Sequence, residues 1–396
     1  MAHNTGMIDP AHPSRPLLVF ADDWGRHPSS CQHLIGKLLP HREVVWVNTI
    51  GTRPPRLDWS TARRVAGKFR QWFGPRPAVP TTAPEQAPAL SPRIISPKMW
   101  PSFRSAFGRG LNRKLLTRAL KSLVESLAQP PDVVTTLPLV ADLIGVLPVR
   151  RWVYYCVDDF SVWPGYDGAT MLTMERDLIP KVDAVVAVSD TLVKHVDELG
   201  KPAHLLTHGV DLDHWRSPVS PGLPLEFAGL KPPVILFWGV VDRRMDMAFV
   251  KHLSAHLPEG TIVLVGPKED PDPELLALPR VVYLPPVAFD RLPALAAAAA
   301  VLVMPYIDAP VTHAMQPLKL KEYIATGRPA VVRALPATKE WGDCVDLAAT
   351  PEEFTARVIN RLTTGLPGDQ NQARVRLNRE GWADKAHQLE KWVNGE

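Results

Sequence analysis

The sequence has few features of a secreted, metal-knotted or membrane-spanning protein. Its three cysteines, Cys31, Cys156 and Cys344, are too few and too far apart for a disulfide framework or a metal cluster. They fit a reducing cytoplasm. The first residues are polar and predict no signal peptide. The longest apolar run, 292–306, is short and contains two prolines, so it is not expected to span a bilayer.

Two further absences narrow the chemistry. No G-x-G-x-x-G follows the first apolar run, which argues against a dinucleotide-dependent dehydrogenase. No D-x-D pair follows an expected strand, so the sequence predicts no metal and no cofactor.

Short apolar runs alternate with helical stretches along the chain. This alternation is typical of doubly wound α/β domains with parallel sheets, and 396 residues suit two such domains. The first sheet is expected to contain strands at 17–21, 44–48, 132–136, 152–156 and 184–188. The second is expected to contain strands at 234–238, 261–265, 281–284, 301–305 and 330–332.

A stretch rich in Pro and Gly, 217–233, is expected to separate the domains. The predicted division is an N-terminal Rossmann-like domain at 1–216, a C-terminal Rossmann-like domain at 217–378, and a terminal helix at 379–396. That helix has an apolar stripe of Trp382, Ala386, Leu389 and Val393. Two such domains meet at the carboxyl ends of their strands, so site residues should follow strands.

The most informative segment is PLKLKEYIATGRPAVV, residues 317–332. Pro317 opens a short helix in which Lys319 and Glu322 share one face. A helix start with a lysine in its first turn suits a phosphate, and a carboxylate one turn later can bind a ribose diol. The pattern therefore predicts a nucleotide-sugar site. An ordinary αβ unit with a surface Lys–Glu pair is the alternative.

This segment resembles the donor-binding helix of bacterial GT-B glycosyltransferases that build cell-surface polysaccharides. In that group a P-x-K-x-x-E-Y/F-x-A-x-G-x-P-V-V pattern closes the nucleotide-sugar pocket. The wider group has a second glutamate eight residues upstream, and this chain has Ala314 there. The resemblance implies a GT-B fold, in which two Rossmann-like domains face a cleft and the terminal helix crosses back to the N-terminal domain.

Other residues of the expected donor site also follow predicted strands. Gly239 permits close backbone approach to a phosphate, and Arg243 or Arg244 can neutralise a diphosphate, although a surface arginine pair is the alternative. The resemblance adds a turn at Gly266, contacts along the base and a histidine near the diphosphate. The full set is Gly239, Arg243, Arg244, Gly266, Leu284, Val287, Gln316, Pro317, Lys319, Glu322 and His208.

The N-terminal domain is expected to bind the acceptor. Asp158 and Asp159 follow a predicted strand, and neighbouring side chains on extended backbone point to opposite sides. One can therefore act as a catalytic base while the other caps a helix, or both can cap. The resemblance implies that one of them lies at the acceptor. His33 is a third catalytic candidate, with a packed helix histidine as the alternative.

Positive charge is concentrated between residues 52 and 122, although the whole chain carries only +4. This segment contains fifteen Lys and Arg but only two acidic residues, which indicates an anionic partner. A predicted helix at 59–73 sets aromatic residues against basic ones, as interfacial membrane helices do, with a core-facing helix as the alternative. Its candidate membrane residues are Trp59, Arg63, Arg64, Lys68, Phe69, Arg70, Trp72 and Phe73. No recognition module supports nucleic acid as the partner.

The sequence thus favours a hexosyltransferase that moves a sugar from a nucleotide sugar, UDP-sugar first, to a lipid-linked saccharide or glycolipid. We expect it to work without metal in surface-polysaccharide synthesis, on the inner face of the bacterial cytoplasmic membrane. In the implied mechanism Glu322 holds the ribose, while Lys319 and Arg244 stabilise the leaving diphosphate. A sugar-nucleotide 2-epimerase and a non-catalytic, membrane-associated sugar-nucleotide-binding protein are the alternatives. The stereochemical outcome stays open.

Overall fold

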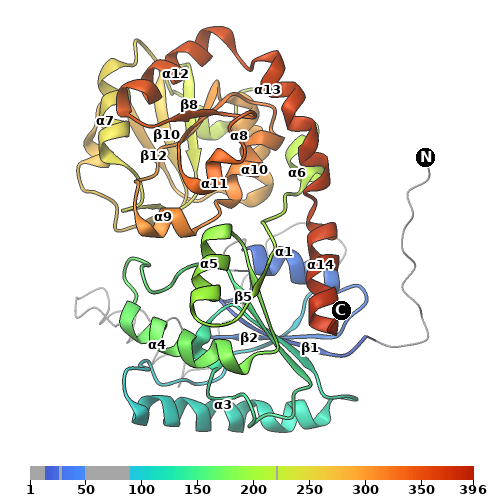
Figure 1. Ribbon diagram of the computed structural model, residues 1–396. Coiled ribbons are helices and arrows are strands. Elements are labelled where there is room, and N and C mark those ends of the chain that lie inside the picture. Colours follow the sequence, from blue (N-terminus) through green and yellow to red (C-terminus); the bar gives the residue numbers. More distant parts are fainter. Residues whose placement is uncertain (1–13, 26–28, 50–89, 220–221) are drawn as a thin grey trace, which may run out of the picture.

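The computed structural model describes residues 14–25, 29–49, 90–219 and 222–396. Two α/β domains lie one above the other, with helices around each sheet (Figure 1). A seven-stranded parallel sheet forms the N-terminal domain and a six-stranded parallel sheet the C-terminal domain. The predicted doubly wound α/β class is therefore confirmed.

The N-terminal sheet has the order β3-β2-β1-β4-β5-β6-β7. Its strands are β1 (Leu17–Ala21), β2 (Val44–Asn48), β3 (Arg93–Ile95), β4 (Asp132–Thr135), β5 (Arg151–Cys156), β6 (Ala184–Ala187) and β7 (Ala203–Leu205). Its helices are α1 (Ser30–Leu38), α3 (Ala106–Ser126), α4 (Gly168–Leu178) and α5 (Asp190–Glu198). The sequence did not predict β3 and β7, since these three-residue edge strands are partly exposed and carry no buried apolar run.

The C-terminal sheet has the order β12-β10-β8-β13-β14-β15. Its strands are β8 (Val234–Trp238), β10 (Thr261–Val265), β12 (Val281–Leu284), β13 (Val301–Met304), β14 (Ala330–Arg333) and β15 (Asp346–Ala348), and β9 (Val241–Asp242) pairs with β11 (Lys268–Glu269). The helices are α6 (Leu212–Arg216), α7 (Met247–His256), α8 (Leu292–Ala298), α9 (Pro310–Ala314), α10 (Leu318–Ala325), α11 (Pro336–Lys339), α12 (Pro351–Thr364), α13 (Gly368–Ala373) and α14 (Trp382–Asn394).

The chain first crosses between the domains at residues 207–209, earlier than the predicted boundary at 216. Leu206 belongs to the N-terminal core, whereas Val210 and Trp215 belong to the C-terminal core. The reason is a long-range aromatic contact, because Trp215 stacks on Trp238 with ring centroids 5.1 Å apart. The Pro- and Gly-rich stretch therefore lies within the C-terminal domain.

The second crossing leads into α14, which packs on the N-terminal domain as predicted (Figure 1). The predicted stripe is buried in the N-terminal core, and its residues are Trp382, Ala386, Leu389 and Val393. The two crossings lie side by side, since Val210 pairs with Gly381. A side chain at Gly209 would collide with the Trp382 ring, so glycine permits this close approach.

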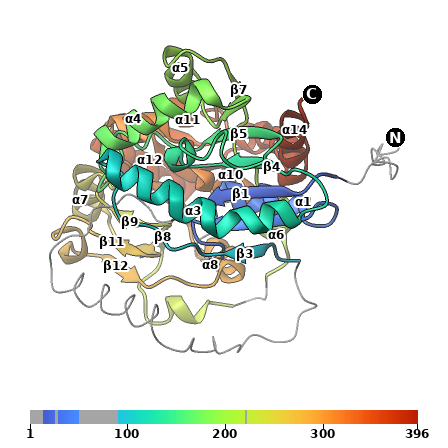
Figure 2. The same ribbon diagram turned by 90° about the horizontal axis from the view of Figure 1, so that it is seen from below.

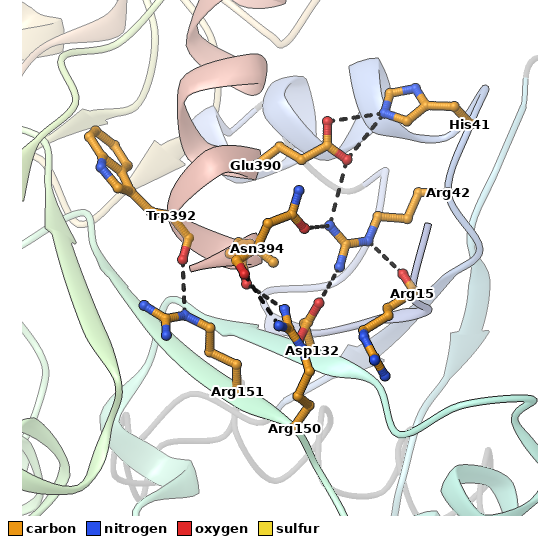
Figure 3. A network of polar contacts seen from close by, with 10 residues as sticks. Arg15, His41, Arg42, Asp132, Arg150, Arg151, Glu390, Trp392 and Asn394 are labelled. Atoms are coloured by element: carbon orange, nitrogen blue, oxygen red, sulfur yellow. Dashed lines mark hydrogen bonds and ion pairs between the residues drawn. The ribbon is translucent and has the colours of Figure 1, made fainter. Parts of the chain in front are cut away.

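Arginines of the N-terminal domain hold the carboxyl end of α14 (Figure 3). Arg150 donates to the carbonyls of Val393 and Asn394, and Arg151 donates to the carbonyl of Trp392 at 3.0 Å. The last carbonyls of a helix lack partners within the helix and carry partial negative charge, so cations stabilise them. These contacts fix the terminal helix to the first domain.

The predicted membrane helix at 59–73 lies outside the described residues. This applies to its candidate residues Trp59, Arg63, Arg64, Lys68, Phe69, Arg70, Trp72 and Phe73. Within the described ranges, no helix has both the length and the apolar character that a bilayer crossing requires.

Candidate active site

Two glycine turns lie against each other at the carboxyl ends of β8 and β10. Gly239 and Gly266 have φ angles of +130° and +140°, a region that favours glycine. The Gly239 amide donates to the Val265 carbonyl at 2.9 Å. A Cβ atom on Gly266 would overlap the Gly239 carbonyl oxygen, and one on Gly239 would lie 2.6 Å from Lys319 Nζ. Bare backbone therefore faces Lys319, as an incoming phosphate requires.

Lys319 lies in the first turn of α10 and faces this glycine turn. Pro317 occupies the N-cap position of the helix, as predicted. The Lys319 ammonium donates to the Tyr306 hydroxyl and lies 5.0 Å from the Phe237 ring centroid. A helix start, a cation and a glycine turn thus meet at one point, which is an arrangement that suits a diphosphate.

Glu322 lies one turn further along α10 and is held by an indole. Trp238 Nε1 donates to Glu322 Oε2 at 2.9 Å, a contact that the sequence did not predict. Burial raises the pKa of Glu322, while the Trp238 hydrogen bond and the Lys319 charge oppose that shift. Glu322 Oε1 has no hydrogen bond to any described residue, so it can accept one from a ribose hydroxyl.

The structure separates the roles of the two candidate arginines. Arg243 is half exposed and forms long ion pairs, at 3.7 and 3.8 Å, with Asp270 and Asp272. Arg244 is 11% exposed and pairs with Asp242 at 2.7 Å. Of the two, only Arg244 is buried toward the opposite domain.

Arg244 contacts the N-terminal domain. Its guanidinium lies 4.9 Å from the centroid of the Trp163 ring, in the loop between β5 and α4. It also acts electrostatically on Asp158 in the same loop. Trp163 was not predicted, because nothing in the local sequence marks it.

The structure also distinguishes the two adjacent aspartates. Asp159 accepts hydrogen bonds from the backbone amide and the hydroxyl of Ser161, so it closes a turn. Burial raises the pKa of Asp158 to about 7, although the charge of Arg244 opposes the shift and the charge of Asp22 adds to it. A carboxylate with a pKa near 7 is suited to act as a general base. Of the two aspartates, Asp158 is therefore the better candidate for a base.

His33 lies in an aromatic cluster between the domains. Its ring stacks on Trp382 at 4.8 Å and lies 6.1 Å from the Phe289 ring. Burial lowers the pKa of His33 to about 4, so the ring is neutral at pH 7. The structure therefore favours the packing alternative for this residue.

His208 and Gln316 meet at the first crossing, where the Gln316 side-chain oxygen accepts a hydrogen bond from the His208 amide. Both ring nitrogens of His208 are buried without a partner among the described residues. Burial, with the charge of Lys321, lowers the pKa of His208 to about 3. Both residues join the domains next to the donor helix.

A buried lysine connects α10 to both crossings. Lys321 is 3% exposed, donates to the His208 carbonyl and pairs with Glu380 at 2.6 Å. Lys385 of α14 pairs with the same carboxylate at 2.9 Å and donates to the Thr207 hydroxyl. The sequence did not predict this cluster, because its members lie up to 178 residues apart.

The remaining positions border the same cleft. The Leu284 carbonyl accepts from the Gly266 amide at 3.2 Å, and Leu284 and Val287 pack partly against the C-terminal core. Ala314, where related sequences carry a glutamate, is buried, and its carbonyl accepts a hydrogen bond from the Ser189 hydroxyl. No group of three His, Cys, Asp or Glu suited to a metal occurs in the part of the chain that the structure describes.

Solved structures with this arrangement of domains identify the fold. Sucrose-phosphate synthase from Thermosynechococcus elongatus aligns with a TM-score of 0.67 at 16% identity, covering 96% of this chain and 99% of that one. The Anabaena protein HepE, in complex with UDP and glucose, aligns with a TM-score of 0.64 at 13% identity, covering 97% and 100%. The fold is GT-B. At these identities the likeness concerns the fold alone.

The GT-B C-terminal domain also matches a family at the sequence level. Residues 232–364 match the family described as Glycosyl transferases group 1. The putative teichuronic acid biosynthesis glycosyltransferase TuaH of Bacillus subtilis is 28% identical over 174 residues, which is 42% of this chain. That match spans 44% of the length of TuaH. The resemblance to GT-B glycosyltransferases of the surface-polysaccharide type is therefore confirmed.

Proposed function

We propose that this protein is a glycosyltransferase that takes a hexosyl group from a nucleotide sugar and transfers it to a lipid-linked saccharide or glycolipid. The observation that carries the proposal is the convergence of Gly239, Lys319 and Glu322. Arg244, which shares the Tyr306 ring with Lys319, links this group to Asp158 through its charge. HepE is seen with UDP and glucose, which supports a UDP-sugar as donor. TuaH is named for teichuronic acid synthesis, which supports a role in surface polysaccharide.

The C-terminal domain binds the donor in this proposal. Lys319, the start of α10 and the Gly239 backbone neutralise the diphosphate, and Arg244 of the same domain adds a positive charge near the Tyr306 ring that Lys319 also contacts. Glu322 accepts a hydrogen bond from the ribose through its free oxygen. These cations and dipoles supply the positive charge that a metal ion would otherwise provide, so we propose that transfer is metal-independent.

The N-terminal domain supplies the base. Asp158 accepts the proton of the acceptor hydroxyl as the acceptor oxygen bonds to the anomeric carbon. The bond from that carbon to the donor phosphate breaks, and the nucleoside diphosphate leaves with the electron pair. Direct displacement of this kind inverts the anomeric configuration. An inverting reaction therefore follows from giving the base role to Asp158.

The acceptor defines where the protein works. A lipid-linked saccharide stays at the membrane, while nucleotide sugars are cytoplasmic metabolites. We therefore propose a peripheral protein on the inner face of the bacterial cytoplasmic membrane, with an anionic leaflet as its partner. The basic character of residues 52–122 supports this location.

Donor turnover is the test of this function. Nucleoside diphosphate release is measured from a panel of nucleotide sugars with and without a lipid extract, and products are identified by mass spectrometry. We expect release of one nucleotide only when extract is present, together with a lipid heavier by one hexosyl residue. Interconversion of the free nucleotide sugar would instead identify a 2-epimerase. Binding without any turnover would identify a sugar-nucleotide-binding protein.

A further inference from the structure

One face of the N-terminal domain combines cations with exposed apolar side chains. It consists of the outer stripe of α3 and the segment that leads into it, and we call it the α3 face. Its residues are Leu90, Ile94, Trp100, Phe107, Arg113, Lys114, Arg118 and Lys121. Seen from below, α3 runs across the near side of the domain (Figure 2).

The charge of this region is strongly one-sided. Residues 90–125 contain eight Lys and Arg but a single acidic residue, Glu125. Lys121 pairs with Glu125 at 3.8 Å. Arg113, Lys114 and Arg118 are exposed and form no ion pair with any described residue. The face therefore presents a positive surface to its surroundings.

Exposed apolar side chains concentrate at the start of the same face. Eleven large apolar side chains are exposed among the described residues, and four of them lie within 90–107. Of these four, Phe107 is the most exposed, at 73%. Clustered apolar exposure is unfavourable in water and marks interaction surfaces.

Hydrogen bonds hold Trp100 against α3. The side chain of buried Asn112 accepts from the Trp100 amide at 2.6 Å and donates to the Trp100 carbonyl at 3.0 Å. A Cβ atom at Gly108 would lie 3.4 Å from the Trp100 ring, so this ring lies against the first turn of α3 at Gly108. A buried amide thus fixes the backbone of Trp100 at the start of the helix.

Helical spacing places three cations on the same stripe as Phe107. Phe107, Lys114, Arg118 and Lys121 share one stripe of α3, while Leu116, Leu120 and Leu123 are buried on the opposite side. A helix with this division has one face for the protein core and one for an external partner. The inner face is buried against the N-terminal core, so the outer face remains available for a partner.

We propose that the α3 face docks on an anionic lipid bilayer, with Trp100 and Phe107 at the interface and the cations at the headgroup phosphates. Nucleic acid would use the same charge, but the aliphatic Leu90 and Ile94 cannot stack on bases. A bilayer buries them. The proposal rests on the proposed function for its purpose, because a lipid-linked acceptor must meet the enzyme at the membrane.

The docked face is linked to the loop that follows β5 by an ion pair. A groove of about 570 Å³ opens between α3 and α4 and is lined by Phe103, Arg104, Arg113 and Thr170, among others. Arg104 pairs with Asp167 at the start of α4, and the loop that ends there carries Asp158. Docking through α3 therefore brings the Asp167 end of this loop toward the membrane surface, while Asp158 at the other end stays near Arg244 of the C-terminal domain.

Vesicle flotation tests the proposal with the full chain. Binding is compared between phosphatidylglycerol-rich vesicles and neutral phosphatidylcholine vesicles, for wild type and the combined R113Q, K114Q and R118Q variant. Each cation near an anionic leaflet contributes roughly fivefold in affinity, so we expect about a hundredfold weaker binding to anionic vesicles. The matched control changes three exposed cations of the C-terminal domain, K251Q, K339Q and R357Q, and should bind as wild type.

Two substitutions of exposed apolar side chains test whether these side chains contribute to vesicle binding. Phe107→Ser should weaken vesicle binding about tenfold, whereas Leu225→Ser, at a side chain that is 85% exposed on the C-terminal domain, should not change it. The proposal is overturned if wild type ignores anionic vesicles or if the α3 variants bind like the controls. Binding of a DNA probe in place of vesicles, with loss in the α3 variants, also overturns it. Nucleotide binding is measured in parallel, so a failure here is distinguishable from a failure of the donor site.

Discussion

Replacing Asp158 by Asn should remove the base while keeping the size of the side chain. The pKa of Asp158 is about 7 because the carboxylate is buried, and the positive charge of Arg244 keeps it from rising further. Positioned general bases contribute roughly a hundredfold to ten-thousandfold in rate. We therefore expect a loss of about 3 to 5 kcal/mol of transition-state stabilisation in the variant.

The base role of Asp158 also predicts the direction in which kcat/KM changes with pH. Asp158 must be ionised to accept a proton, so kcat/KM of wild type should rise with pH and level off above about pH 7. Arg244→Gln removes the charge that favours the ionised form, so the rising limb should move to higher pH. Initial rates of nucleoside diphosphate release with acceptor present, measured from about pH 5 to pH 9, record both effects.

The matched control is Asp159→Asn, which alters the hydrogen bonds to Ser161 but leaves Asp158 in place. It should keep the pH profile of wild type and lose some stability. Near-normal turnover and an unchanged pH profile in Asp158→Asn would refute the assignment of the base.

Two predictions concern stability. Gly266→Ala should lower the free energy of unfolding by about 3 kcal/mol or more, because its Cβ would overlap the Gly239 carbonyl at a positive φ. Gly110→Ala, in α3 with open space around it, should raise the free energy of unfolding by about 0.5 to 1 kcal/mol. Equal urea midpoints for the two variants would contradict this reasoning. His33 has a pKa of about 4 in the folded protein, so between pH 7 and pH 5 it takes up a proton only when the chain unfolds. The free energy of unfolding of wild type should therefore fall by about 2 kcal/mol over this range. His33→Phe keeps the stack on Trp382 but has no group to protonate, so its free energy of unfolding should fall by about 2 kcal/mol less than that of wild type between pH 7 and pH 5. An equal fall in both proteins, measured by urea unfolding, would count against a buried neutral ring.

The strands were predictable where they are buried on both faces. The run 234–238 has its predicted bounds because a central parallel strand reads as continuous apolar sequence. Edge strands such as β3 lack that signal, since their side chains are partly exposed. The domain boundary was misplaced for a related reason, because the contact between Trp215 and Trp238 joins residues whose sequence positions do not reveal it.

The donor site was more accessible to sequence reasoning than the acceptor site. Lys319 and Glu322 belong to one short helix, where spacing alone decides that they share a face. The choice between Arg243 and Arg244 depends on which acidic partners lie nearby in space. Nothing in the local sequence singles out Lys321, which the structure buries against Glu380 of a distant segment.

Calorimetric binding of UDP, GDP, dTDP, CMP and their common sugars to wild type and Glu322→Ala is the most direct test of the donor site. We predict that one nucleoside diphosphate binds selectively, with UDP first, and that its affinity falls by roughly tenfold or more in the variant because a buried ribose hydroxyl loses its acceptor. No binding across the panel would contradict the account, and so would selective binding that Glu322→Ala leaves unchanged.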